Sequence, residues 1–74
     1  MKKYIFFFTK KLDGIYRLKA WTDCFMQVDA RRNDLSEEEY SYSENRAKSY
    51  EAKTRIIRAP NFKIALDIAS TYNF

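Results

Sequence analysis

The sequence predicts a small α+β domain in which an antiparallel sheet opens with a β-hairpin and carries a C-terminal helix packed against it. Three observations lead to this fold class. An apolar, β-rich run at residues 3–9 precedes Asp13-Gly14, a strong hairpin-turn signal. A second β-rich run covers residues 52–58, and residues 62–72 place apolar side chains at helical spacing. The 74 residues contain no repeat or linker, so we expect a single domain over 1–74.

The hairpin is expected over residues 3–22. A two-residue Asp-Gly turn would place Phe8 opposite Lys19 and Phe6 opposite Trp21. One face would then carry Ile5, Phe7, Thr9, Tyr16, Leu18 and Ala20, and the other Tyr4, Phe6, Phe8, Ile15 and Trp21 interleaved with Lys10, Arg17 and Lys19. Because both faces are apolar, the second face needs a cover from the middle segment, a second protomer or a partner.

The middle of the chain leaves two alternatives open. Residues 24–32 favour a continued strand or a bend. Ser36 and Glu39 then form a capping box, which predicts a helix from about residue 37 to 50. Residues 40–43 alternate Tyr and Ser in the manner of an edge strand, so residues 36–50 are interpreted as a helix or an extra strand.

The last third of the sequence has clearer signals. A strand over 52–58 ends at Pro60, and Asn61 is a natural helix N-cap. Ala65, Leu66 and Ala69 lie on one face of the helix that follows, at about 62–72. We expect this face to pack on the sheet.

Missing residue types exclude several kinds of function. The chain has no histidine, which removes Ser-His and Cys-His nucleophilic arrangements and speaks against ordinary zinc sites. Its one cysteine, Cys24, permits no internal disulfide and favours a reducing compartment. No stretch approaches the roughly 20 apolar residues of a membrane span. We therefore expect a cytoplasmic, non-enzymatic protein with no metal, no cofactor and no membrane contact.

Charge is divided along the chain. Residues 1–20 carry six basic side chains and one acidic, residues 21–52 carry eight acidic and four basic, and residues 53–74 carry four basic and one acidic. The acidic middle includes three consecutive glutamates, which suit either a helix N-terminus or a basic partner surface. Aromatic side chains anchor protein interfaces because they offer rigid apolar area. We expect a protein partner to contact Phe6, Phe8, Trp21, Glu37, Glu38, Glu39, Tyr40 and Tyr42.

Two further function classes remain alternatives. Rings can stack on unpaired bases while cations engage phosphates, so a nucleic-acid interface would use Lys10, Arg17, Lys19, Phe6, Phe8 and Trp21. A toxin-type ribonuclease is the third class, since that chemistry can proceed without histidine. A homodimer is also compatible with so short a chain, because small domains bury a small share of their surface.

In size and expected manner of action, the chain looks like the small inhibitors that bacteriophages make against host machinery, including anti-CRISPR and anti-restriction proteins. The similarity rests on size and general manner, and on no sequence motif. It implies a viral inhibitor that occupies a surface of a protein partner.

Overall fold

The computed structural model describes all residues, 1–74, and confirms the α+β fold. The elements run in the order β1 (Lys2–Lys10), β2 (Tyr16–Leu18), the 3-10 turn η1 (Trp21–Asp23), β3 (Phe25–Val28), α1 (Glu37–Ser49), β4 (Ala52–Ala59) and α2 (Phe62–Thr71). The strands form one antiparallel sheet. Neither helix is long and apolar enough to cross a membrane.

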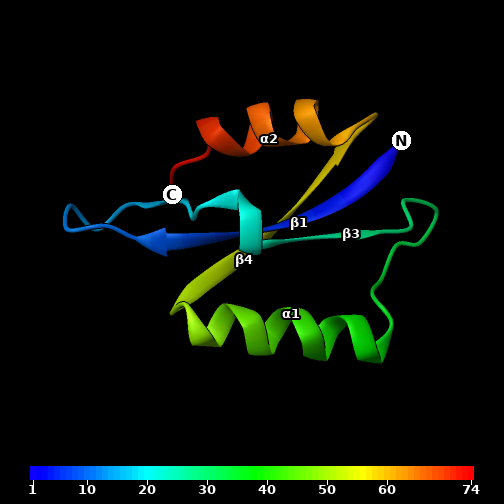
Figure 1. Cartoon of the computed structure of the whole chain (residues 1–74), viewed down its shortest axis with the longest axis horizontal. Helices are drawn as coiled ribbons and strands as arrows, with labels where there is room; N and C mark the ends of the chain where they lie inside the picture. Colours follow the sequence, from blue (N-terminus) through cyan, green and yellow to red (C-terminus); the bar gives the residue numbers. More distant parts are fainter.

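Strand β1 is the centre of the sheet. β4 pairs with it from Lys2 to Thr9 on one side, while β2 and β3 share the other side, β2 beside its C-terminal end and β3 beside its N-terminal end. Helices α2 and α1 lie on opposite faces of the sheet, so the molecule has three layers (Figure 1). β4 and β3 each pair only with β1, so their outer sides are the free edges of the sheet.

Both faces of β1 are buried by the chain itself. Six consecutive residues, Lys3 to Phe8, are buried, which explains why the run reads as continuously apolar rather than alternating. The α2 side holds the rings of Tyr4, Phe6 and Phe8 against Ile57, Ala59, Ala65 and Ala69. The α1 side holds Ile5, Phe7, Cys24, Val28 and Ala47. The two helices thus supply the cover that a two-faced apolar strand requires.

Lys3 is the one charged side chain in this buried run, with 1% of its surface exposed. Its ammonium donates a hydrogen bond to the carbonyl oxygen of Arg32. A buried polar group must be paired to be tolerated. The contact therefore ties the segment between β3 and α1 to the central strand.

The hairpin turn differs from the one expected. The Lys11 amide donates to the Ile15 carbonyl (3.0 Å), the Gly14 amide donates to the Lys11 carbonyl (2.9 Å), and Gly14 has φ +83°. This is a three-residue loop in which a type I turn is followed by a left-handed glycine. The expected two-residue turn was wrong because an Asp-Gly pair suits both loop lengths.

The longer loop shifts the register by one residue. Phe8 lies opposite Leu18 and not Lys19. A one-residue shift moves every side chain of a strand to the other face, so Tyr16 and Leu18 pack with Phe8 on the α2 side, contrary to our expectation.

The second half of the expected hairpin strand is also absent. After Lys19, whose amide still donates to the Phe7 carbonyl (2.9 Å), the chain leaves the sheet and forms η1 at Trp21–Asp23. Phe25 takes the position opposite Phe6 that we assigned to Trp21. The chain rejoins β1 through the Phe7 amide, which donates to the Cys24 carbonyl (3.1 Å). Trp21 therefore lies outside the sheet rather than within a strand.

The outer edge of β2 is closed by the chain's last residue. The Tyr16 amide donates to the Phe74 carbonyl (2.7 Å), and the Phe74 amide donates to the Tyr16 carbonyl (3.3 Å). The Phe74 ring stacks on Tyr16 with centroids 5.4 Å apart. This pairing shields the short strand that would otherwise be exposed.

Of the two alternatives left open for residues 36–50, the structure has the helix and not the extra strand. The Ser36 hydroxyl accepts from the Glu39 amide and the Glu39 carboxylate accepts from the Ser36 amide, both at 3.1 Å. These two bonds satisfy donors that a helix start leaves free, which is why α1 begins at Glu37. In the same way, the Asn61 side chain accepts from the Ile64 amide (3.0 Å) and starts α2.

Replacing Gly14 by valine should lower the free energy of unfolding by about 1–2 kcal/mol, because a β-branched residue is strained at positive φ. Gly14→Asn should cost less, because asparagine tolerates the left-handed region. Urea denaturation of the three proteins measures both differences. Equal stability of Gly14→Val and the parent would contradict the turn described here.

Replacing Phe8 by alanine should lower the free energy of unfolding by about 3–5 kcal/mol, since the ring has no exposed surface and leaves a cavity. Leu12→Ala, in the fully exposed loop, is the matched control and should change it by less than about 0.5 kcal/mol. Thermal and urea unfolding provide the comparison. A Phe8→Ala protein as stable as the control would show that Phe8 lies outside the core.

Candidate functional site

The structure separates the residues expected to meet a partner into buried and accessible ones. Phe6 and Phe8 have no exposed surface, so as folded they contact only the core. Trp21, Tyr40 and Tyr42 are 43%, 60% and 49% exposed. Tyr40 lies at the β4 side of α1, whereas Tyr42 lies at the β3 side.

The basic side chains of the hairpin do not form one surface. Lys10 lies on the α2 side of the sheet, opposite Tyr16. Arg17 points to the other face and forms an ion pair with Asp13 at 2.8 Å. The Lys19 ammonium lies 4.9 Å from the ring centroid of Tyr50. Together with the burial of Phe6 and Phe8, this leaves no continuous stacking platform on the hairpin.

A different group of aromatic side chains gathers at the outer edge of β3. The Phe62 ring of α2 lies 5.1 Å from Trp21 and 4.5 Å from Phe25 between ring centroids. Beside this cluster a hollow of about 340 Å³ is lined by Phe25, Met26, Glu38, Glu39 and Tyr42. We refer to the accessible set as the β3-edge surface, which comprises Trp21, Phe25, Met26, Glu38, Tyr42 and Phe62.

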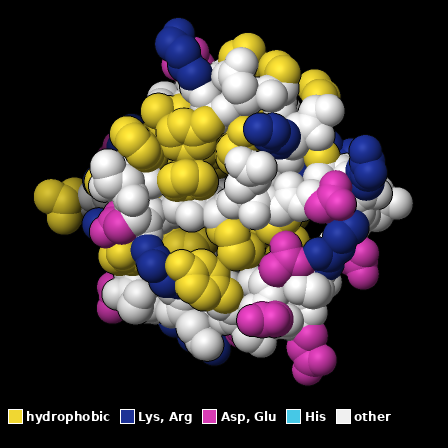
Figure 2. Space-filling view, turned by 45° about the vertical axis from the view of Figure 1, so that its right-hand side comes forward, with side chains coloured by type: hydrophobic (Ala, Val, Ile, Leu, Met, Phe, Trp, Pro, Cys, Tyr) yellow, Lys and Arg dark blue, Asp and Glu magenta, His cyan; other side chains and the backbone are white.

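Figure 2 shows this side of the molecule. Hydrophobic side chains gather in an upper and a lower group, and acidic side chains gather beside the lower group. The sequence identified Trp21, Glu38 and Tyr42. It missed Phe25, Met26 and Phe62, which come from β3 and α2 and meet only in the folded chain. No local spacing signals that meeting.

Trp21 is held in place by contacts of η1. The Tyr50 hydroxyl at the end of α1 donates to the Asp23 carboxylate (2.9 Å), and that carboxylate raises the pKa of Tyr50. The Cys24 amide donates to the Trp21 carbonyl at 3.3 Å. These bonds hold the backbone of the short turn, and the Phe62 ring lies 5.1 Å from the indole between ring centroids.

Tyr42 is held in a similar way. Arg46, one helical turn later, donates to the Tyr42 hydroxyl (3.2 Å), and its guanidinium lies 5.6 Å from the Tyr42 ring centroid. The same guanidinium lies 5.9 Å from the ring of Tyr50. Tyr42, Arg46 and Tyr50 thus form a row of cation–π contacts along one side of α1.

The three consecutive glutamates have different roles. Glu39 accepts hydrogen bonds from Ser36 and from the Arg32 guanidinium, and these bonds lower the pKa of Glu39 to about 2. Glu37 and Glu38 are exposed and have no cation within 4.0 Å. Glu39 therefore stabilises the start of α1, whereas Glu37 and Glu38 are available to an outside charge.

The remaining side chains provide no metal centre. No group of three or more Asp, Glu, Cys or His side chains lies close enough to hold an ion. The chain matches no protein-family model, no curated protein and no solved structure.

Glu39→Gln should make the stability of the protein less dependent on pH. Because the folded pKa of Glu39 lies below its usual 4.5, the carboxylate stabilises the fold above that pH and loses this contribution as pH falls toward about 2. The difference in unfolding free energy between parent and Glu39→Gln should therefore be larger at pH 7 than at pH 3. Urea denaturation at both pH values tests this.

Glu38→Gln is the matched control, since its carboxylate has no hydrogen bond or ion pair in the structure. It should match the parent at pH 7. If Glu39→Gln also matched the parent at pH 7, Glu39 would contribute nothing to the start of α1.

Proposed function

We propose that this protein is a non-enzymatic binding protein that acts by occupying a surface of a protein partner with its β3-edge surface. The observation that carries the proposal is the half-exposed Trp21, held against Phe62 and Phe25 beside the hollow at β3. Tryptophan and tyrosine dominate the energetics of protein interfaces when they are rigid and become desolvated. In the free protein Trp21 packs against Phe62, and Tyr42 accepts a hydrogen bond from Arg46.

The charge of this surface indicates the kind of partner. Glu37 and Glu38 are exposed and unpaired at the start of α1. They complement a partner face that carries lysine or arginine next to an apolar pocket. Occupying such a face would block a basic groove, including one that otherwise binds nucleic acid. More specifically, we propose that the protein is an inhibitor of the kind that bacteriophages make against host machinery.

The state of the only cysteine supports a non-enzymatic role. Cys24 is buried, its thiol donates to the Lys19 carbonyl at 3.2 Å, and burial raises the pKa of the thiol. Reactive cysteines have a lowered pKa and some exposure. Cys24 therefore packs as a small hydrophobic residue on the α1 side of the sheet.

Trp21→Ala should weaken partner binding by more than about 2 kcal/mol while the protein stays folded, because an exposed anchor costs more in the complex than in the free chain. The partner is first isolated on the immobilised protein from a nuclease-treated lysate of the native cell, and the purified proteins are then titrated by calorimetry. Thermal unfolding is measured on the same samples.

Leu12→Ala is the control at an exposed site far from the β3-edge surface and should bind as the parent does. The double variant Glu37→Lys, Glu38→Lys should weaken binding as well, because it reverses the charge that faces a basic partner. It leaves the Glu39 cap of α1 in place, so the fold should be kept. Unchanged affinity of Trp21→Ala would reject this surface. Capture that disappears after nuclease treatment would favour a nucleic-acid ligand instead.

A further inference from the structure

The outer edge of β4 is a second candidate interface, independent of the β3-edge surface. β4 is eight residues long and pairs only with β1, so one side of its backbone meets no other strand. An unpaired edge of this length can receive a further strand.

The register shows which peptide groups are free. The amide and carbonyl of Phe7 bond to Cys24 and Lys19, on the side of β1 away from β4. Successive residues of a strand point their peptide groups to opposite sides. Thr54 lies opposite Phe7, so its amide and carbonyl point away from β1, and the same holds for Ala52, Ile56 and Arg58.

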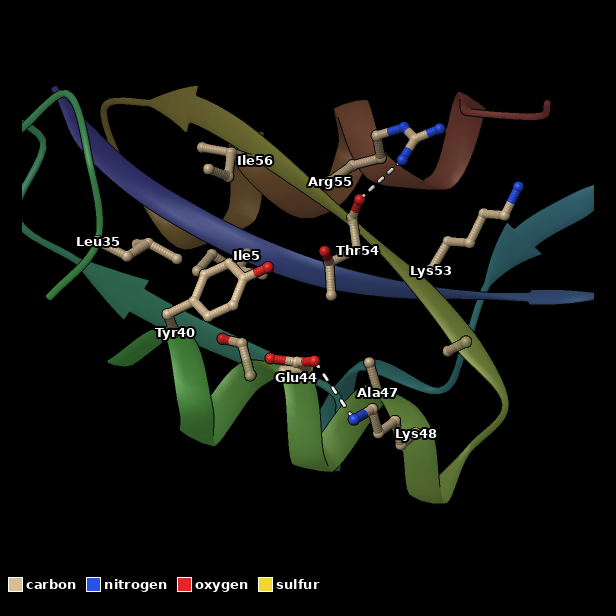
Figure 3. A pocket seen from close by; sticks show the side chains of 12 residues that line it. Ile5, Leu35, Tyr40, Glu44, Ala47, Lys48, Lys53, Thr54, Arg55 and Ile56 are labelled. Carbon is tan, nitrogen blue, oxygen red and sulfur yellow. Dashed lines mark hydrogen bonds and ion pairs between the residues drawn. The ribbon is translucent and has the colours of Figure 1, made fainter. Parts of the chain in front are cut away.

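One side-chain contact agrees with this assignment. The Arg55 guanidinium donates to the Thr54 carbonyl at 2.9 Å. The dashed line in Figure 3 marks this bond at the outer side of β4. A carbonyl that accepts a hydrogen bond from a neighbouring side chain in this way has no backbone partner in the sheet.

An open groove of about 440 Å³ runs between this edge and α1. Buried Ile5 and Ala47 line it together with Ile56, which is 49% exposed. Tyr40 rises from α1 toward Ile5, and the Glu44–Lys48 ion pair (3.3 Å) lies along the same helix (Figure 3). The groove can therefore receive apolar side chains on the α1 face of an added strand.

The opposite face of β4 carries two cations in its first half, before the buried Ile57 and Ala59. Lys53 and Arg55 lie opposite Phe8 and Phe6, which places both on the α2 side. Their charged groups lie over aromatic rings, the Lys53 ammonium 4.6 Å from the Tyr16 centroid and the Arg55 guanidinium 3.9 Å from that of Phe74. Neither has a carboxylate within 4.0 Å. β4 thus carries two cations that have no carboxylate partner and lie over aromatic rings on the α2 face of the sheet.

We propose that the β4 edge binds an acidic extended segment of a protein partner as an added strand. Alternate apolar side chains of that segment enter the groove beside Ile56, and the intervening carboxylates meet Lys53 and Arg55. Main-chain hydrogen bonds to Thr54 and Ile56 supply affinity, and the alternation supplies specificity.

Charge decides between this occupant and a second copy of the chain. Pairing β4 with β4 of another copy would bring together two strands that each carry Lys53, Arg55 and Arg58, and like charges oppose that pairing. Cations along an edge also discourage indiscriminate pairing. Ile56, exposed at the middle of the strand, gives the edge an apolar contact that a purely protective edge would lack.

The probe is a ten-residue synthetic peptide that alternates valine and glutamate, titrated into the 15N-labelled protein. In the free protein, the amides of Thr54 and Ile56 should exchange with solvent much faster than those of Arg55 and Ile57. The peptide should slow exchange at Thr54 and Ile56 specifically. A peptide with lysine in place of glutamate should bind at least tenfold more weakly.

Thr54→Pro is the decisive variant, because it removes an outward amide that β1 does not use, and proline is tolerated at such edge positions. It should raise the Kd for the peptide at least tenfold, while Thr54→Val should leave it unchanged. The double variant Lys53→Glu, Arg55→Glu leaves the backbone hydrogen bonds of β4 intact and should also raise the Kd for the peptide at least tenfold. Trp21→Ala should bind the peptide as the parent does, which separates this proposal from the β3-edge surface.

Three results would overturn the proposal. They are no slowing of exchange at Thr54 and Ile56 by the glutamate peptide, equal binding of the lysine peptide, and an unchanged Kd for the Lys53→Glu, Arg55→Glu variant. Concentration-dependent protection of the same amides without peptide would assign the edge to a second copy instead.

Discussion

The burial of β1 on both faces is the constraint on which the rest of this structure depends. Phe6 and Phe8 project to one side and Ile5 and Phe7 to the other, and all are buried. A strand of this kind cannot form half of a two-layer domain, because its second apolar face would lie in water. One helix on each face supplies that cover, and the sheet between the helices has four strands. The sheet is therefore narrow, and two of its edges stay open.

Signals that act within a few residues were sufficient to predict most of the fold. The capping box at Ser36 and the N-cap at Asn61 satisfy helix-end donors wherever the helix packs, so the start of each helix could be placed from the sequence. The Tyr-Ser alternation at residues 40–43 still left residues 36–50 open between a helix and a strand. The register of β2 could not be placed, because the backbone of Gly14 permits turns of different length and only packing selects between them. The expected position of Trp21 opposite Phe6 was derived from that register, so it was wrong as well.

The candidate site was predictable to the extent that it consists of exposed side chains on one element. Glu38 and Tyr42 follow from the helix alone. Phe25 of β3 and Phe62 of α2 meet Trp21 only through tertiary packing, which no local sequence pattern indicates. Folding also gives the charge division of the sequence a spatial meaning: unpaired carboxylates lie at the start of α1, and unpaired cations lie along β4. One small domain thus presents two edges of opposite character.

The contact between α2 and the sheet limits how this chain can change over generations. Ala65 and Ala69 have no exposed surface and face a layer of aromatic rings that includes Phe6 and Phe8. Large rings and small helix residues share a fixed volume there, and tightly packed interiors tolerate exchanges that conserve volume far better than single enlargements. A larger residue on α2 needs a smaller one on β1 at nearly the same time. Homologous sequences should therefore show correlated substitutions between these two elements, with each position nearly invariant when its counterpart is unchanged.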